Sequence, residues 1–422
     1  MTSTPVSAGR SGIHWPVVAL TFLAVLLDGF DTATLAFVVP TLAQEWGTAP
    51  AAFTVPLVLT NVGVVIGYLT CGSLGAWLGR RTLLIAGVAL FAVTTLLVAI
   101  VLPVQSIALL GALRLLTGLG LGAVLPVAVS FATERCSARR RELVSVIVTL
   151  GLASGGTLGG FFGGQLILAV GAAGVFWVAG LVPLVLTGVM AWGLPVEVRS
   201  AVDAEQGRYE AKVGRLFDPG LRVSTSLLWA FAFLVFVAAY TLSSWVPTLL
   251  TGYGFTPAEA PMGLAFLNLG GVLGGILLIP LAARIGIAPA LVLMPVVGVL
   301  CMLTAARVPM SDTMLLLVLG GAGAGVTASQ IGQLTLAVAL YPTGTRTTGV
   351  GWAAALGRAG SIVGPGVAGI LLGLALPGPD IILLTTLPVV VAAVCAAVLW
   401  RRRSRAADPE RERVDGEQPE PA

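Results

Sequence analysis

The sequence predicts an all-α membrane protein with twelve transmembrane helices in two six-helix repeats. Of the 422 residues, 57% are hydrophobic and 10% are charged, which excludes a soluble domain of ordinary composition. Twelve apolar runs reach the length of about 20 residues that a helix needs to cross a bilayer. Basic residues gather in alternate connections between these runs, as they do on the cytoplasmic side of membrane proteins.

The predicted spans follow from the apolar runs and the polar residues that end them. They lie at 16–39, 53–76, 82–102, 106–131, 143–170, 174–194, 225–250, 262–282, 288–305, 313–340, 347–374 and 381–400. Residues 195–224 form the one long polar connection, so we expect an N-terminal bundle at 16–194 and a C-terminal bundle at 225–400. The tails, 1–15 and 401–422, are polar, and the charged C-terminal tail is predicted to be disordered.

The two predicted bundles resemble each other. A Gly-Leu-Gly-Leu-Gly run at 118–122 in the fourth span is matched by Gly-Ala-Gly-Ala-Gly at 321–325 in the tenth. Repeats of this kind are typical of transporters that bind their substrate near the middle of the membrane. The basic connections at 80–81, 139–141 and 401–403 predict that both termini are cytoplasmic. The membrane is expected to be the inner membrane.

Two carboxylates interrupt the first span. Asp28 and Asp31 lie three residues apart and therefore project from one face of the helix. A charge at the centre of a bilayer costs at least about 2.5 kcal/mol, so this face is expected to line a wet cavity. Two carboxylates so close exchange protons as one coupled unit, and we interpret them as the proton-coupling site.

Two arginines lie at a similar depth. Arg114 in the fourth span and Arg358 in the eleventh each offer a planar fork that suits a carboxylate and stays charged. We expect them to bind the carboxylate of an organic anion, which would favour proton uptake by the aspartates. The alternative is that Asp28 or Asp31 forms a structural bridge with Arg114.

Other polar and aromatic side chains in the spans are candidates for substrate contact. Ring stacking would hold an aromatic substrate, and amides would bond its hydroxyl groups, although helix packing is an open alternative for each. These candidates are Tyr240, Trp245, Asn268, Gln330 and Gln333. At the cytoplasmic rim, gating or a signal for membrane orientation is expected of Glu134, Arg80, Arg81, Arg139, Arg140, Arg141 and Arg346.

Several stretches resemble known transporters. Residues 72–81 are similar to the loop motif of the major facilitator superfamily, and 114–120 to its arginine and glycine motif in the fourth span. The stretches at 28–33, 216–220, 244–250 and 341–352 resemble the aromatic acid:proton symporter family. The chain departs from the loop motif at Ala76-Trp77, where the superfamily carries Asp-Arg. A latch between the halves would then be weaker, or built from Glu134 and nearby arginines.

The resemblance implies the major facilitator fold and proton-coupled uptake of a small aromatic carboxylate such as benzoate, 4-hydroxybenzoate or protocatechuate. The alternatives are transport or export of another organic anion or drug, and a membrane sensor that does not transport. An enzyme is not expected, because the sequence has no catalytic triad, phosphate-binding loop or metal-ligand cluster. We expect no cofactor, no metal and no nucleic acid, and a monomer in the lipid bilayer that binds an aromatic acid and protons.

Overall fold

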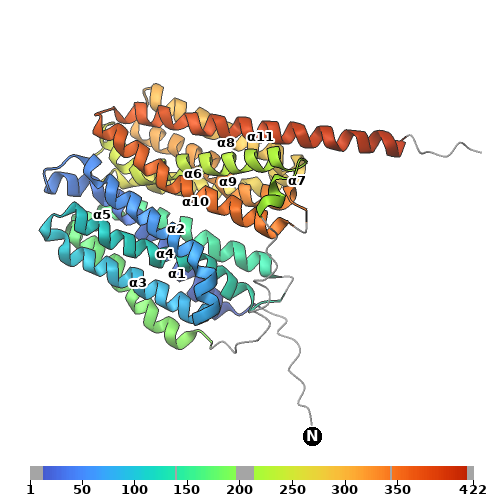
Figure 1. The fold of residues 1–422 in the computed structure, drawn as a ribbon. Coiled ribbons are helices and arrows are strands. Elements are labelled where there is room, and N and C mark those ends of the chain that lie inside the picture. Colours follow the sequence, from blue (N-terminus) through green and yellow to red (C-terminus); the bar gives the residue numbers. More distant parts are fainter. Residues whose placement is uncertain (1–12, 138–139, 196–212, 343–344, 416–422) are drawn as a thin grey trace, which may run out of the picture. The chain divides into compact units, whose positions relative to one another are not determined.

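The computed structural model describes residues 13–137, 140–195, 213–342 and 345–415. In this part of the chain, long helices dominate and a single isolated β-bridge joins Ile13 to Cys136. The all-helical fold predicted from the apolar runs is therefore confirmed (Figure 1). The helices are α1 (Trp15–Glu45), α2 (Thr54–Leu78), α3 (Arg80–Val101), α4 (Ile107–Thr133), α5 (Arg141–Gly193), α6 (Arg222–Thr251), α7 (Pro261–Ile285), α8 (Ile287–Arg307), α9 (Asp312–Leu340), α10 (Arg346–Gly373) and α11 (Gly378–Asp415).

Eleven helices of the described part are long and apolar enough to cross a membrane. The longest, α5, has 53 residues, which is about twice what one crossing needs. Gly171 interrupts it with φ 71° and ψ 174°, a conformation that is essentially restricted to glycine. Because Gly171 lies between the predicted spans 143–170 and 174–194, each of the twelve predicted spans corresponds to a helical segment.

The ends of two predicted segments differ from the structure. The last helix continues past residue 400 to Asp415, so helix covers most of the tail for which we expected no structure. Alanine, arginine and glutamate are strong helix formers, which explains why the helix extends. The rest of the tail, and residues 196–212 of the predicted linker, lie outside the described residues.

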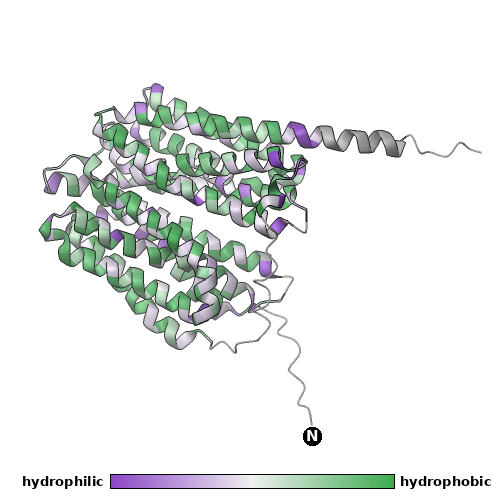
Figure 2. Cartoon of the chain, viewed as in Figure 1, coloured by the Kyte–Doolittle hydropathy of each residue, from purple (hydrophilic) through white to green (hydrophobic). Residues whose placement is uncertain are grey.

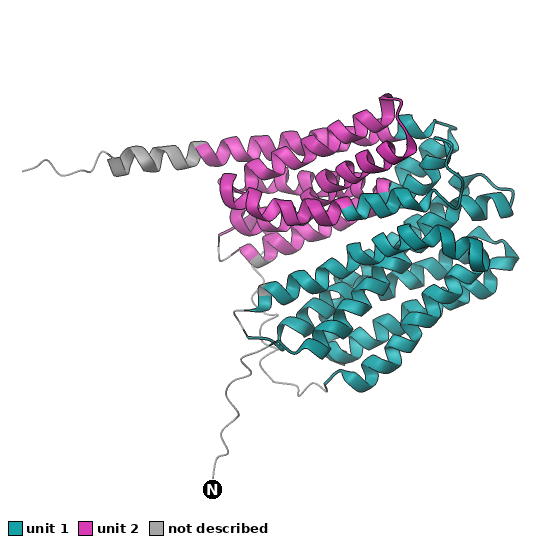
Figure 3. Cartoon of the chain, turned by 180° about the vertical axis from the view of Figure 1, so that it is seen from behind, with its two compact units in different colours: residues 1–208, 243–269, 365–381 teal, residues 209–242, 270–364, 382–422 magenta. Residues whose placement is uncertain are grey.

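Two compact units divide the chain (Figure 3). Unit 1 comprises residues 1–208, 243–269 and 365–381, and unit 2 comprises 209–242, 270–364 and 382–422. In unit 1, α1 packs on α5, α2 packs on α4, and α3 packs on both α4 and α5; in unit 2, α8 packs on α9. Parts of the predicted second bundle thus belong to unit 1, and the division into six and six helices stays a prediction.

Glycines let the helices of unit 1 approach at backbone distance. A Cβ atom at Gly118 of α4 would lie 2.1 Å from the backbone oxygen of Thr60 in α2, and one at Gly122 would lie 2.2 Å from that of Val64. Large apolar side chains such as Trp192 and Leu168 are 95% and 76% exposed, as expected of surfaces in contact with lipid. Apolar residues cover much of the helical surface in Figure 2. Together with the eleven long apolar helices of the described residues, this makes the chain a multi-pass membrane protein.

Candidate functional site

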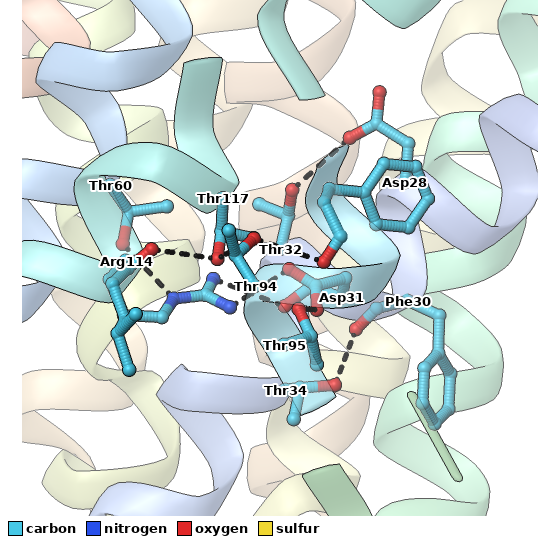
Figure 4. A network of polar contacts seen from close by, with 12 residues as sticks. Asp28, Phe30, Asp31, Thr32, Thr34, Thr60, Thr94, Thr95, Arg114 and Thr117 are labelled. Carbon is cyan, nitrogen blue, oxygen red and sulfur yellow. Dashed lines mark hydrogen bonds and ion pairs between the residues drawn. The ribbon is translucent and has the colours of Figure 1, made fainter. Parts of the chain in front are cut away.

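A buried ion pair joins α1 to α4 in unit 1 (Figure 4). Nη1 of Arg114 lies 2.9 Å from Oδ2 of Asp31, and both side chains are fully buried. Nη2 of Arg114 also donates to the backbone oxygen of Asp31 at 3.4 Å. The contact is therefore single rather than the two-pronged carboxylate contact that a guanidinium permits.

Threonines complete the surroundings of this ion pair. Oγ1 of Thr95 in α3 donates to the second carboxylate oxygen of Asp31 at 2.7 Å. Nε of Arg114 donates to Oγ1 of Thr60 at 3.2 Å, and that hydroxyl donates in turn to the backbone oxygen of Pro56. Four helices, α1 to α4, thus hold one charged pair. Sequence reasoning missed these threonines, although hydroxyl groups in strongly apolar spans would have been a signal.

Asp28 lies about one helical turn before Asp31 and is 4% exposed. Oγ1 of Thr32 donates to its carboxylate at 3.4 Å. In Figure 4 the carboxylate of Asp28 points away from the guanidinium of Arg114. The structure thus gives different surroundings to two aspartates that we had interpreted as one unit, since Asp31 forms the ion pair with Arg114 and Asp28 accepts from Thr32.

A second cluster lies in unit 2, between α6, α9 and α10. Nη1 of Arg358 donates to the hydroxyl of Tyr240 at 2.9 Å, and the guanidinium lies 5.9 Å from the ring centre of Phe236. The rings of Phe236 and Tyr240 stack with centres 5.8 Å apart. Gln333 of α9 is 2% exposed. Its amide and the ring of Phe236 both lie next to Gly357, at 3.1 and 3.0 Å from the position of a Cβ atom there. Three predicted substrate contacts, Arg358, Tyr240 and Gln333, therefore lie in one cluster.

The other predicted substrate contacts have surroundings of their own. Trp245 is fully buried, and its Nε1 donates to the backbone oxygen of Pro365 at 2.9 Å, which is a packing contact. Asn268 donates to the backbone oxygen of Leu264 on its own helix. Gln330 lies on α9, three residues before Gln333, and is half-buried.

At the predicted cytoplasmic rim, Arg80 at the start of α3 forms an ion pair with Glu134 at the end of α4. Arg81 donates to the backbone oxygens of Leu194 and Ala191 at the end of α5. This ion pair is one contact from which a latch of Glu134 and nearby arginines could be built, and the gating role of these residues stays a prediction. Arg139 lies outside the described residues, and Arg140 and Arg141 are exposed at the start of α5.

Arg346 begins α10, and its Nε donates to the backbone oxygen of Tyr341 at 3.2 Å. Burial raises the pKa of Tyr341, whose hydroxyl donates to Thr225 at 3.3 Å. Beyond the end of α6, burial and then the charge of Asp380 raise the pKa of Tyr253 to about 12. Both phenols are therefore protonated at neutral pH.

Known families and proteins are similar to this chain. The model of the Major Facilitator Superfamily matches residues 21–365. The 4-hydroxybenzoate transporter PcaK of Pseudomonas aeruginosa is 31% identical over 421 residues, covering 93% of each chain. The gallate transporter of Pseudomonas putida is 30% identical over the same share. The 3-(3-hydroxy-phenyl)propionate transporter of Escherichia coli is 31% identical and covers 96% of this chain and 98% of the relative.

Solved structures show the same fold. A bacterial homologue of the human lysosomal transporter Spinster, in an inward-facing and occupied conformation, has a TM-score of 0.73 at 17% identity and covers 93% of this chain and 98% of its own. The nucleoside transporter NupG has a TM-score of 0.71 at 15% identity and covers 92% and 98%. The chain therefore belongs to the Major Facilitator Superfamily, as a transporter whose relatives carry aromatic acids and not as an enzyme.

Proposed function

We propose that the protein takes up a small aromatic carboxylate together with protons. The observation that carries the proposal is the fully buried ion pair of Asp31 and Arg114 in the membrane-spanning part of unit 1. Relatives named for gallate and 4-hydroxybenzoate support the substrate class, and benzoate, 4-hydroxybenzoate and protocatechuate are the first candidates.

The ion pair explains how a proton would be coupled to an anion. While Asp31 is ionised, its charge balances that of Arg114, which cannot lose its own proton. A proton on Asp31 leaves the guanidinium uncompensated in a dry site, which is strongly unfavourable. A rearrangement of the surrounding helices would follow and relieve this imbalance. Asp28, one turn away on the same helix, would pass the proton to and from Asp31.

The cluster in unit 2 has the chemistry to hold the aromatic acid itself. The guanidinium of Arg358 attracts the carboxylate, and the ring of Phe236 offers an apolar face for stacking. Aromatic pairs contribute about 0.5–1.5 kcal/mol beyond the burial of their surface. We assign the carboxylate of the substrate to Arg358, because Arg114 already forms an ion pair with Asp31 in this structure.

We further propose that the protein is a monomer in the inner membrane with both termini in the cytoplasm. The basic residues at 80–81, 140–141 and 401–403 support this orientation, because positive charges are retained on the cytoplasmic side. With the termini inside, the ion pair of Arg80 and Glu134 lies at the cytoplasmic rim.

Uptake into proteoliposomes tests the proposal. Purified protein is reconstituted, and labelled benzoate, 4-hydroxybenzoate and protocatechuate are offered with a pH gradient alone or a membrane potential alone. One proton carried with one carboxylate moves no net charge. We therefore expect a gradient that is acidic outside to drive uptake and a potential alone to drive none. A response to the potential would indicate additional protons, at about 2.3 kcal/mol per charge per 100 mV.

Variants of the charged residues accompany this test. Asp31→Asn and Asp28→Asn should abolish uptake driven by the pH gradient, and Arg114→Lys should reduce it, because lysine does not reproduce the planar guanidinium. If all three variants respond to the pH gradient as the native protein does, the assignment of the proton site to these residues is wrong. Binding of the acids without any uptake would favour a sensor instead.

A further inference from the structure

Gln333 carries a buried acceptor with no hydrogen-bond partner. The side chain is 2% exposed, and its Oε1 finds no donor among the described residues. A buried polar atom left unpaired costs about 1–3 kcal/mol, so each such atom calls for an explanation, and a ligand that donates to it is one. The surroundings of Gln333 indicate what kind of ligand would suit this acceptor.

Gln333 borders the aromatic cluster of unit 2. A Cβ atom built at Gly357 would lie 3.1 Å from Nε2 of Gln333 and 3.0 Å from the ring of Phe236. The amide and the ring edge therefore approach the same point of α10. The next residue along α10 is Arg358, whose guanidinium lies over the ring of Phe236. Gly357 keeps this point open, since any larger residue would displace the amide or the ring.

The groups of this cluster match three parts of a hydroxylated aromatic acid. A guanidinium suits the carboxylate, the ring of Phe236 suits the aromatic ring, and an unpaired carbonyl oxygen accepts a hydrogen bond from a phenolic hydroxyl. Benzoate has no such donor. We propose that Gln333 selects aromatic acids that carry a ring hydroxyl over those that carry none. This inference rests on the proposed function and adds the feature by which substrates are distinguished.

The test compares the uptake of 4-hydroxybenzoate, 3-hydroxybenzoate and benzoate by the native protein and its variants. Gln333→Leu removes the acceptor, and Gln333→Met removes it while keeping the length of the side chain. Each variant should lower the ratio of hydroxybenzoate to benzoate uptake efficiency by about 5–10-fold, the value of one hydrogen bond. Benzoate uptake by the same variants is the reference for this ratio, because benzoate has no ring hydroxyl to donate to the amide.

Ser329→Ala is the matched control. Ser329 lies on the same helix, is fully buried, and donates only within that helix, to the backbone oxygen of Gly325 at 2.7 Å. Its removal should leave the substrate ratio unchanged. An unchanged ratio in both Gln333 variants would overturn the inference while leaving the proposed function intact. Failure of the native protein to transport any of the acids would overturn the proposed function and the inference with it.

Discussion

At the scale of single residues, the stability of the protein depends on Asp31 and Arg114 being present together. A buried ion pair contributes little net stability, because removing both charges from water costs about as much as their attraction returns. Loss of one partner leaves a buried charge uncompensated. Asp31 also accepts from Thr95, Arg114 also donates to Thr60, and both side chains are fully buried, so the remaining partner would be a charge without solvent contact.

This asymmetry predicts the effect of substitution. Asp31→Asn should destabilise the protein by about 3–5 kcal/mol, because the charge of Arg114 is then unpaired. Combining it with Arg114→Gln should recover much of the loss, since two amides of similar shape carry no charge. The unfolding temperature of purified protein in detergent measures both effects. A double variant that loses the sum of the two single effects would show that the pair does not act as one unit.

The sequence singled out these charged residues and allowed a bridge from either aspartate to Arg114, but it did not tell which aspartate forms the bridge. Two aspartates three residues apart in an apolar run point to one helix face, and that inference needs no structure. The rotation of α1 then decides which of them meets the arginine, and packing with α3 and α4 sets that rotation. The sequence has no local signal for this, so it predicted a shared role for Asp28 and Asp31.

At the scale of elements, glycines position the helix that carries Arg114. Gly118 lies one turn after Arg114 and touches the backbone of α2 beside Thr60, the residue that accepts from Nε of Arg114. Close approach of the two helices thus brings the hydroxyl of Thr60 within reach of the guanidinium. Small residues at such contacts are typical of helix pairs in membranes.

Gly118→Ala should therefore damage both stability and transport. Its Cβ atom would lie 2.1 Å from the backbone oxygen of Thr60, so the two helices must separate. Overpacking of this kind costs about 1–3 kcal/mol, and the shift should weaken the contact of Arg114 with Thr60. The unfolding temperature and the rate of uptake measure the two effects.

Gly72→Ala provides the comparison. Gly72 also lies in a helix, α2, but a Cβ atom there would meet nothing within 4 Å. This variant should keep native stability and native uptake. Equal behaviour of the two alanine variants would mean that the approach of α2 and α4 does not depend on glycine.

The elements themselves were predictable to a large extent. Each span is a run of apolar residues that ends where polar residues begin, and the bilayer imposes a common length. The break at Gly171 falls between two predicted spans for the same reason. The extension of α11 to Asp415 was not predicted, because a polar segment of strong helix formers resembles both a disordered tail and an exposed helix.

At the scale of the whole molecule, contacts between segments that are far apart in the sequence determine which parts of the protein must separate during transport. Ala51, in the short 3-10 helix Pro50–Phe53, lies next to Gly373 at the end of α10, and both belong to unit 1. These residues are more than 300 positions apart, which no periodicity in the sequence reveals. Alternating access requires parts of the first and second predicted bundles to separate during transport. We expect the contact of Ala51 with Gly373 to open in each cycle.

A disulfide across this contact should therefore stop transport. A Cβ atom at Gly373 would lie 3.7 Å from that of Ala51, which matches the spacing in disulfides, about 3.8 Å. Ala51→Cys with Gly373→Cys, in a background whose four native cysteines are replaced by alanine, should lose uptake on oxidation and regain it on reduction. Labelled uptake before and after each treatment is the measurement, and gel mobility after cleavage between the cysteines gives the bridged fraction.

The control bridge lies within the first predicted bundle. Gly87 of α3 and Ala123 of α4 offer a comparable spacing of 3.8 Å, but rigid movement of the bundle does not separate them. Gly87→Cys with Ala123→Cys should form its bridge and continue to transport. Uptake that persists after complete bridging of residues 51 and 373 would show that this contact stays closed throughout the cycle. The moving boundary would then lie elsewhere in the chain, because transport still requires some contact between the bundles to open.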